Sequence, residues 1–179
     1  MMVHARRIAS IIATALLTSG LAPVLPANRA VVQRSPAHAR AAFEKLRAIT
    51  GTWAFTTDID HGRVTYELVS NGAAILERVM NEEHGETGMV SMIHLDGDRL
   101  VLQHYCSAGN QPRLVSNGLD GNEIRFTFER AWNMPSRDAG HIDGAVFRFP
   151  ANGRFESTWI WRQKGADEIS TRRHSRADQ

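Results

Sequence analysis

Residues 88–106 read GMVSMIHLDGDRLVLQHYC, with apolar and polar side chains alternating on both sides of a central Asp96-Gly97-Asp98. A period of two is typical of a strand that has one face against a core. An Asp-Gly turn between two such runs is typical of an antiparallel hairpin. We therefore expect two neighbouring antiparallel strands here, joined by a tight turn.

The same pattern continues in both directions from Gly51 to the C-terminal region. Gly- and Asn-containing turns recur between the alternating runs, and none of the intervals is long enough for a crossover helix. Parallel connections are thereby excluded, because each needs a dozen or more residues. The candidate strands are Thr52–Asp58, Arg63–Val69, Ala74–Met80, Gly88–Leu95, Arg99–Cys106, Leu114–Leu119, Glu123–Glu129, Ile142–Phe149, Phe155–Gln163 and Glu168–Arg173.

About ten antiparallel strands must close on themselves or split into two sheets, because a long open sheet leaves unpaired edges. One up-and-down meander that closes into a barrel fits best, and a two-sheet sandwich is the alternative. A barrel of about ten strands is wider than its own side chains can fill, so it tends to hold a cavity. The last run, Glu168–Arg173, is short, and closure at that point is the least defined.

A single helix is expected ahead of the strands. Ser35-Pro36 fits an N-cap followed by a proline in the first turn, and apolar residues follow at helical spacing up to Ile49. Gly51 can supply the left-handed residue that ends a helix. The predicted fold class is therefore all-β, an antiparallel up-and-down β-barrel preceded by one short α-helix.

The N-terminus has the features of a secretory signal peptide. Arg6 and Arg7 precede a short apolar run, and small residues follow it at Ala27 and Ala30, where cleavage is expected. This interpretation divides the chain into a signal peptide (1–30), a linker with the helix (31–50) and the barrel domain (51–179). It places the mature protein in the periplasm or outside the cell, with no stable membrane anchor; an uncleaved anchor or a misplaced start codon is the alternative.

The charge distribution argues against nucleic acid as a partner. The net charge is +2, but residues 1–40 carry five arginines and no acidic residue, so the rest of the chain is at −3. No basic stripe with interleaved aromatic residues is present, as a nucleic-acid interface would require.

Two motifs resemble known families. Gly51-Thr52-Trp53, placed after a helix and before a meander, resembles the calycin group (lipocalins, fatty-acid-binding proteins and relatives). More specifically, residues 94–100 and 104–113, together with Gly140-His141 and a Trp-rich late strand, look like a bacterial lipocalin-like family of unknown function. The resemblance implies a ligand cavity and a Trp53 that closes one barrel end beneath a basic residue, for which Arg162 is the candidate.

His104 and Cys106 lie two residues apart, so they would share the inner face of one strand. A histidine beside a cysteine can lower the thiol pKa and produce a nucleophile. With His141 the pair could also form part of a metal or haem site, although no tight ligand spacing is present. The simpler interpretation is a buried cysteine beside a hydrogen-bonded histidine, so no metal and no cofactor are predicted.

Two loops add candidate ligand-binding residues. The long linker 130–140 carries Trp132 and Met134, and could be a lid over the barrel mouth or a packed loop. Asn110 and Gln111 could grip a polar ligand head or tie neighbouring strands together.

Three functions remain open on the sequence alone. The first is an exported barrel that binds a small, largely apolar molecule, with His104, Cys106, His141 and the two loops as its candidate site. The second is an enzyme, or a metal or haem protein, built on the two histidines and the cysteine. The third is a structural protein with a filled barrel. The oligomeric state is not predicted.

Overall fold

The computed structural model describes residues 36–81, 85–150 and 154–177, with side chains described outside 81–87. The predicted signal peptide, its cleavage after Ala27 or Ala30, and the Ser35 N-cap lie outside the described residues. No helix among these residues has the length and apolar composition that crossing a membrane requires.

The elements follow the expected order of one helix and then strands. The helix α1 spans Pro36–Arg47, and a single 3-10 turn lies at Ser70–Gly72. The strands are β1 (Gly51–Thr56), β2 (His61–Val69), β3 (Ala74–Asn81), β4 (Gly85–Asp96), β5 (Arg99–Tyr105), β6 (Gln111–Ser116), β7 (Leu119–Asp120), β8 (Glu123–Trp132), β9 (His141–Arg148), β10 (Phe155–Gln163) and β11 (Ala166–Arg176).

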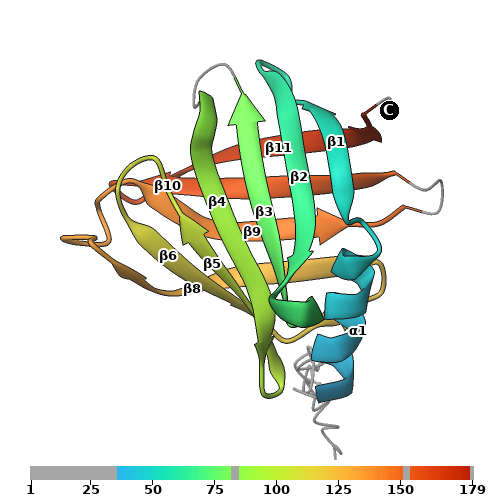
Figure 1. Cartoon of the computed structure of the whole chain (residues 1–179). Coiled ribbons are helices and arrows are strands. Elements are labelled where there is room, and N and C mark those ends of the chain that lie inside the picture. Colours follow the sequence, from blue (N-terminus) through green and yellow to red (C-terminus); the bar gives the residue numbers. More distant parts are fainter. Residues whose placement is uncertain (1–35, 82–84, 151–153, 178–179) are drawn as a thin grey trace, which may run out of the picture. The chain divides into compact units, whose positions relative to one another are not determined.

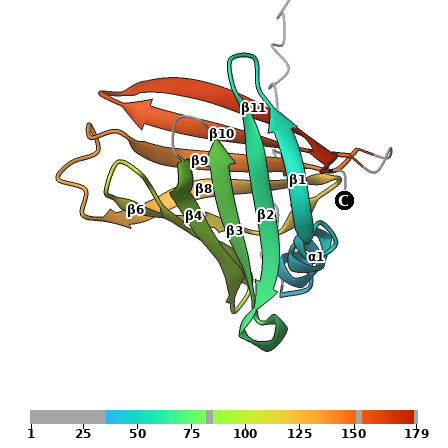
Figure 2. The ribbon, with the colours of Figure 1, turned by 45° about the horizontal axis from the view of Figure 1, so that its top comes forward.

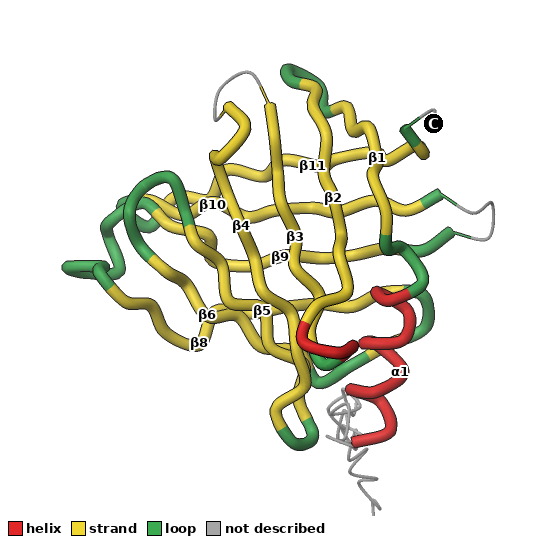
Figure 3. The backbone as a smooth tube through the Cα atoms, in the orientation of Figure 1, coloured by secondary structure: helices red, strands yellow, loops and turns green. Residues whose placement is uncertain are grey.

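The strands close into an antiparallel up-and-down barrel (Figures 1 and 3). Each strand of the ring pairs with its neighbour along the chain, β6 pairs with β8, and β1 pairs with β11. The two-residue β7 pairs with the start of β8 beside this ring. The predicted barrel of about ten strands is confirmed, because β1–β6 and β8–β11 form a closed ring with no free edge.

The last strand is longer than the sequence pattern predicts. β11 runs to Arg176 and pairs with β10 over nine residues from Phe155 to Gln163. Its final four residues then pair with Trp53–Thr56 of β1. This second pairing closes the ring, so the doubt about closure at the C-terminus is resolved.

Helix α1 contacts β4, β5 and β7. In the view of Figure 2 it lies beside the lower end of β1. Its buried face consists of Ala39, Ala42, Phe43 and Leu46, as the helical spacing predicts. The expected stop at Gly51 is wrong, since the helix ends at Arg47 and Ala48–Thr50 turn the chain into β1. Gly51 does have a positive φ of 121°, but as the first residue of that strand.

Gly51 and Trp53 form the floor of the barrel with an arginine that differs from the one expected. The guanidinium of Arg176 lies 4.1 Å from the ring of Trp53, whose Nε1 donates to Ile49 O. A Cβ on Gly51 would come 2.6 Å from Arg176 Nη1, so the glycine leaves room for this guanidinium. The prediction of Arg162 is wrong: it pairs with Asp143 and Asp167 instead, because the β1–β11 register places Arg176 opposite Trp53.

Aromatic side chains fill the interior between this floor and the middle of the barrel. Phe155 packs edge-on against Trp53 and Tyr66, and Phe147 packs edge-on against Phe126 and Trp159. Rings in such perpendicular contacts pack densely and add stabilisation beyond the area they bury. The end of the barrel next to α1 is therefore solid.

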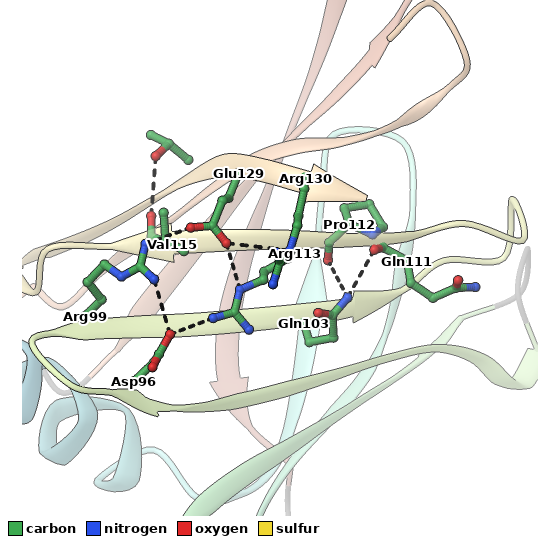
Figure 4. A network of polar contacts seen from close by, with 10 residues as sticks. Asp96, Arg99, Gln103, Gln111, Pro112, Arg113, Val115, Glu129 and Arg130 are labelled. Carbon is green, nitrogen blue, oxygen red and sulfur yellow. Dashed lines mark hydrogen bonds and ion pairs between the residues drawn. The ribbon is translucent and has the colours of Figure 1, made fainter. Parts of the chain in front are cut away.

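Outside the barrel, four charged side chains form a closure network across β4, β5, β6 and β8 (Figure 4). Arg99 and Arg113 each bind both Asp96 and Glu129. The network lies where β6 meets β8 and where the register shifts between Arg113 and Leu114. It therefore holds together a seam of the ring that has an irregular backbone ladder.

Replacing Glu129 with Gln should weaken this seam modestly. The hydrogen bond from Arg99 is the largest of the effects that hold the pKa of Glu129 below its usual range. Exposed ion pairs each contribute roughly 0.2–1 kcal/mol, so we expect Glu129→Gln to lower the free energy of unfolding by about 1 kcal/mol. Urea unfolding measures the loss, which should shrink at about 1 M salt because exposed charges are screened there. A loss unaffected by salt would contradict an electrostatic role.

Candidate functional site

A cavity of about 350 Å³ opens at the barrel end opposite α1. Chain segments from both sides of the closed ring line it, including the β1–β2 loop, the β5–β6 loop and the inner faces of β9, β10 and β11. Its lining residues, which define the mouth cavity, are Thr57, Ile59, Asp60, Met89, Cys106, Ser107, Ile142, Trp159, Trp161, Glu168, Ser170 and Arg172.

The apolar wall of the mouth cavity comes mainly from two tryptophans of β10. Trp159 and Trp161 are two residues apart and point to the same side of the strand, together with buried Phe155 and Ser157. A Cβ on Gly140 would overlap the ring of Trp161, so this glycine lets the ring lie against the backbone. The alternation along β10 thus places both rings on the cavity side, and the close contact with Gly140 fixes the position of Trp161.

Arg172 is the cationic residue of the cavity lining. Along β11 the inward positions are Ser170, Arg172 and His174, which are paired with Trp159, Ser157 and Phe155. The guanidinium lies 5.0 Å from the ring centre of Phe55 and 5.4 Å from that of Trp159. Burial lowers the pKa of Arg172, and the nearby charges of Glu77, Tyr66 and Asp60 oppose this effect.

A polar row crosses the interior beneath the mouth cavity. It consists of Tyr66, Glu77, Ser91 and His104, which are directly opposite one another on β2, β3, β4 and β5. Tyr66 donates a 3.0 Å hydrogen bond to Glu77 Oε1, and Ser91 Oγ lies 3.0 Å from His104 Nδ1. Four buried polar groups at the same level make this a distinct layer of the barrel interior.

Burial dominates the electrostatics of this polar row. It raises the pKa of Glu77, while hydrogen bonds from Ser91 and Tyr66 and the charge of Arg172 act in the opposite direction. Burial also raises the pKa of Tyr66 well above its ordinary value, and the charge of Glu77 adds to the effect. Burial therefore favours the neutral forms of Glu77 and Tyr66, as an environment with little water does.

Of the sequence candidates, Cys106 lines the mouth cavity and His104 belongs to the polar row beneath it. The ring of His104 lies 5.6 Å from that of Trp159, which forms part of the cavity wall. Burial raises the pKa of the Cys106 thiol, against weaker hydrogen bonds with Ala108 and Ser107. A raised thiol pKa disfavours the thiolate, so the environment does not activate a nucleophile.

His141 lies in different surroundings from His104 and Cys106. Arg137 donates to its Nε2 at 2.7 Å, which leaves Nδ1 to donate to Ala139 O at 2.6 Å. Its neighbour Ile142 lines the mouth cavity, and adjacent side chains of a strand point to opposite faces. Among the described residues, no group of three or more His, Cys, Asp or Glu side chains is placed to hold a metal ion.

The remaining four candidates, at the start of β6, at the end of β8 and in the adjoining loops, do not belong to the lining of the mouth cavity. Asn110 Nδ2 donates to Gly140 O at 2.8 Å, and Asn133 Nδ2 donates to Gln111 Oε1 at 2.8 Å. Trp132 is 46% exposed beneath Arg130. Met134 is half-buried in the same β8–β9 loop.

These contacts have a consequence for the cavity wall. The bond from Asn110 ties the β5–β6 turn to the β8–β9 loop at Gly140, and Gly140 is the residue against which Trp161 lies. The hydrogen bonds of Asn110 and Gln111 thus connect neighbouring chain segments, which is the structural one of the two roles considered for them. Most of the linker 130–140 is exposed, and its last residue, Gly140, lies against Trp161.

Sequence reasoning missed most of the mouth cavity, including its two tryptophans and Arg172, and, beneath it, every member of the polar row except His104. The alternation of Trp159 and Trp161 was the available signal for the wall. No protein-family model matches the chain, and no curated protein matches it significantly. The closed ten-strand meander is compatible with a calycin-like fold.

Proposed function

We propose that this chain is an exported, lipocalin-like protein that binds a small, largely apolar molecule in the mouth cavity. The observation that carries the proposal is the cavity lining, in which Trp159, Trp161 and Ile142 face an opening at one end of a closed barrel. Concave sites with aromatic walls and a few polar groups are the usual form of small-molecule sites. The cavity of about 350 Å³ has room for a ligand with one or two rings.

The division of the barrel into a solid end and an open end supports the same proposal. Packed aromatic rings occupy the end next to α1, so a ligand enters only as far as the layer of Arg172 and the polar row. This geometry favours a short amphipathic molecule over a long chain. The alternative of an enzyme, or of a metal or haem site on His104, Cys106 and His141, has no comparable support, because His141 is engaged with Arg137 and Ala139.

Filling the cavity should weaken binding strongly without harming the fold. Ser170 lines the mouth cavity, whereas its neighbour Ile169 is 66% exposed on the outer face of β11. We expect Ser170→Phe to weaken binding of the fluorescent probe N-phenyl-1-naphthylamine at least about tenfold, since one excluded ring removes most of the buried apolar area. Ile169→Phe is the matched control and should bind like the wild type.

The measurement is a fluorescence titration of the probe with each of the three proteins. Circular dichroism verifies that both variants keep the strand content of the wild type. A wild-type protein that does not bind the probe, or equal affinities for Ser170→Phe and Ile169→Phe, would refute the mouth cavity as the binding site.

A further inference from the structure

Arg172, which is half-buried, gives the mouth cavity a single positive charge. It is the only Lys, Arg or His among the described residues of the lining, and the rings of Phe55 and Trp159 flank it. The two acidic residues of the lining, Asp60 and Glu168, are partly or fully exposed. A cation in such surroundings attracts an anion strongly, because little water is present to solvate it.

Glu77, on β3, is the buried acidic group whose charge acts on Arg172 of β11. Its side chain is 0% exposed, and the charges of the two residues act on each other. Tyr66 donates to Glu77 Oε1, while Glu77 Oε2 has no hydrogen-bond partner within the described part of the chain. A buried carboxyl oxygen with no partner is unfavourable, and protonation of this oxygen removes the charge.

An anion bound at Arg172 would compete with the charge of Glu77. Two negative charges beside one cation repel each other, and the repulsion is strong in a medium of low polarity. Proton uptake by Glu77 removes this repulsion and leaves the bound anion as the counter-charge of Arg172. Anion binding and Glu77 protonation are therefore linked.

We propose that the mouth cavity takes amphipathic molecules whose single anionic head group lies at Arg172, and that binding of the anion is linked to proton uptake by Glu77. The proposal rests on the proposed function of the cavity and specifies its ligand class. The proton comes from solvent, and no covalent bond forms or breaks. The aromatic wall of Trp159 and Trp161 receives the apolar body of the ligand.

The other titratable groups near Glu77 and Arg172 are less suited to take up this proton. Burial keeps Tyr66 protonated by raising its pKa, and Ser91 does not ionise in this range. His174 follows Arg172 on the inner face of β11, and burial lowers its pKa to about 3. His104 lies beyond Ser91 in the polar row, and Asp60 acts on Arg172 from the rim. Glu77 is therefore the group to vary.

The test compares two probes that differ by one charge. 8-Anilinonaphthalene-1-sulfonate is N-phenyl-1-naphthylamine with a permanently ionised sulfonate added. We expect the affinity of the wild type for the sulfonate to fall at least about tenfold between about pH 5 and about pH 9, and that for the neutral probe to stay constant. Calorimetry in two buffers of different ionisation enthalpy should show proton uptake with the sulfonate alone.

Variants assign this effect to the two residues. Glu77→Gln mimics the protonated acid, so it should bind the sulfonate tightly across the whole pH range and take up no proton. Glu67→Gln, on the exposed face of β2, is the matched control and should keep the wild-type pH dependence. Arg172→Gln should lose binding of the sulfonate at least about tenfold while the neutral probe still binds.

Each outcome bears on one claim. Wild-type affinities for the two probes that depend on pH to the same extent would overturn the linkage, as would a Glu77→Gln variant that keeps the pH dependence. Should Arg172→Gln fail to fold, the double variant Glu77→Gln/Arg172→Gln, which leaves no unpaired buried charge, takes its place with the same expected loss. Binding of the neutral probe in the cavity would leave the proposed function intact even if the linkage fails.

Discussion

Gly118→Ala is expected to lower the free energy of unfolding by roughly 3–5 kcal/mol, a large part of the stability of a small domain. Gly118 has a φ of 115°, a conformation that residues with a Cβ rarely adopt. A Cβ at this position would also overlap the backbone carbonyl of His38 in α1. The substitution would therefore strain the β6–β7 turn and push the helix away from the barrel end that it covers.

Gly121→Ala separates these two effects. Gly121 also has a positive φ, 57°, but a Cβ there would meet no atom within 4 Å. This control should cost only about 1–2 kcal/mol, which is the strain of the left-handed conformation. Urea unfolding followed by tryptophan fluorescence measures both variants. Equal losses for the two would show that α1 does not depend on the close approach at Gly118.

Acid should destabilise the protein through His174. Its ring is 3% exposed, stacks on Phe155 with centroids 3.9 Å apart, and lies 2.9 Å from Ser157 Oγ through Nε2. Burial and then the charge of Arg172 lower its pKa from 6.5 to about 3. The unfolded chain therefore takes up a proton at His174 more readily than the folded protein does.

The sign of the effect follows from this difference. The stability contributed by neutral His174 is fully present above about pH 6.5 and is lost as the pH falls towards about 3. The loss is at most about 1.4 kcal/mol per pH unit, so roughly 2–3 kcal/mol disappears between pH 6.5 and pH 4.5. His174→Gln cannot be protonated and should show a shallower decline of stability over this range.

Urea unfolding at several pH values provides the comparison. His38→Gln is the matched control, because His38 is an exposed histidine of α1. It should lose stability with falling pH as the wild type does. A His174→Gln variant with the acid sensitivity of the wild type would contradict the assignment, even if the substitution lowers stability at neutral pH.

The fold could be predicted because its determinants are local. The period of two and the recurring turns specify neighbouring antiparallel strands, and the number of strands requires closure. The end of β11 escaped prediction because residues 168–176 are mostly polar. Arg172 and His174 point inward but are polar, so the alternation of apolar and polar residues that predicts a strand is absent there. The predicted strand is therefore shorter than β11.

The site was less predictable because it depends on the register between strands. Alternation along 99–106 places His104 and Cys106 on one face, but only the pairing of β2 through β5 brings Tyr66, Glu77 and Ser91 into line with His104. The unknown register also explains why the sequence suggests Arg162 instead of Arg176 as the residue that packs on Trp53. Both arginines follow the tryptophans of β10 along the chain, and only the pairing of β1 with β11 distinguishes them. The shift between Ile160 and Trp161 further separates His141 from the cavity lining.

The central claim, that a small apolar molecule occupies the mouth cavity, can be tested at Cys106. This residue lines the cavity and is the only cysteine of the chain, so its alkylation reports on one position. The rate of reaction with iodoacetamide is measured by mass spectrometry with and without saturating N-phenyl-1-naphthylamine. We predict that the bound probe slows alkylation at least about tenfold, because the thiol is covered. An unchanged rate while the probe is bound would place the ligand elsewhere and contradict the account.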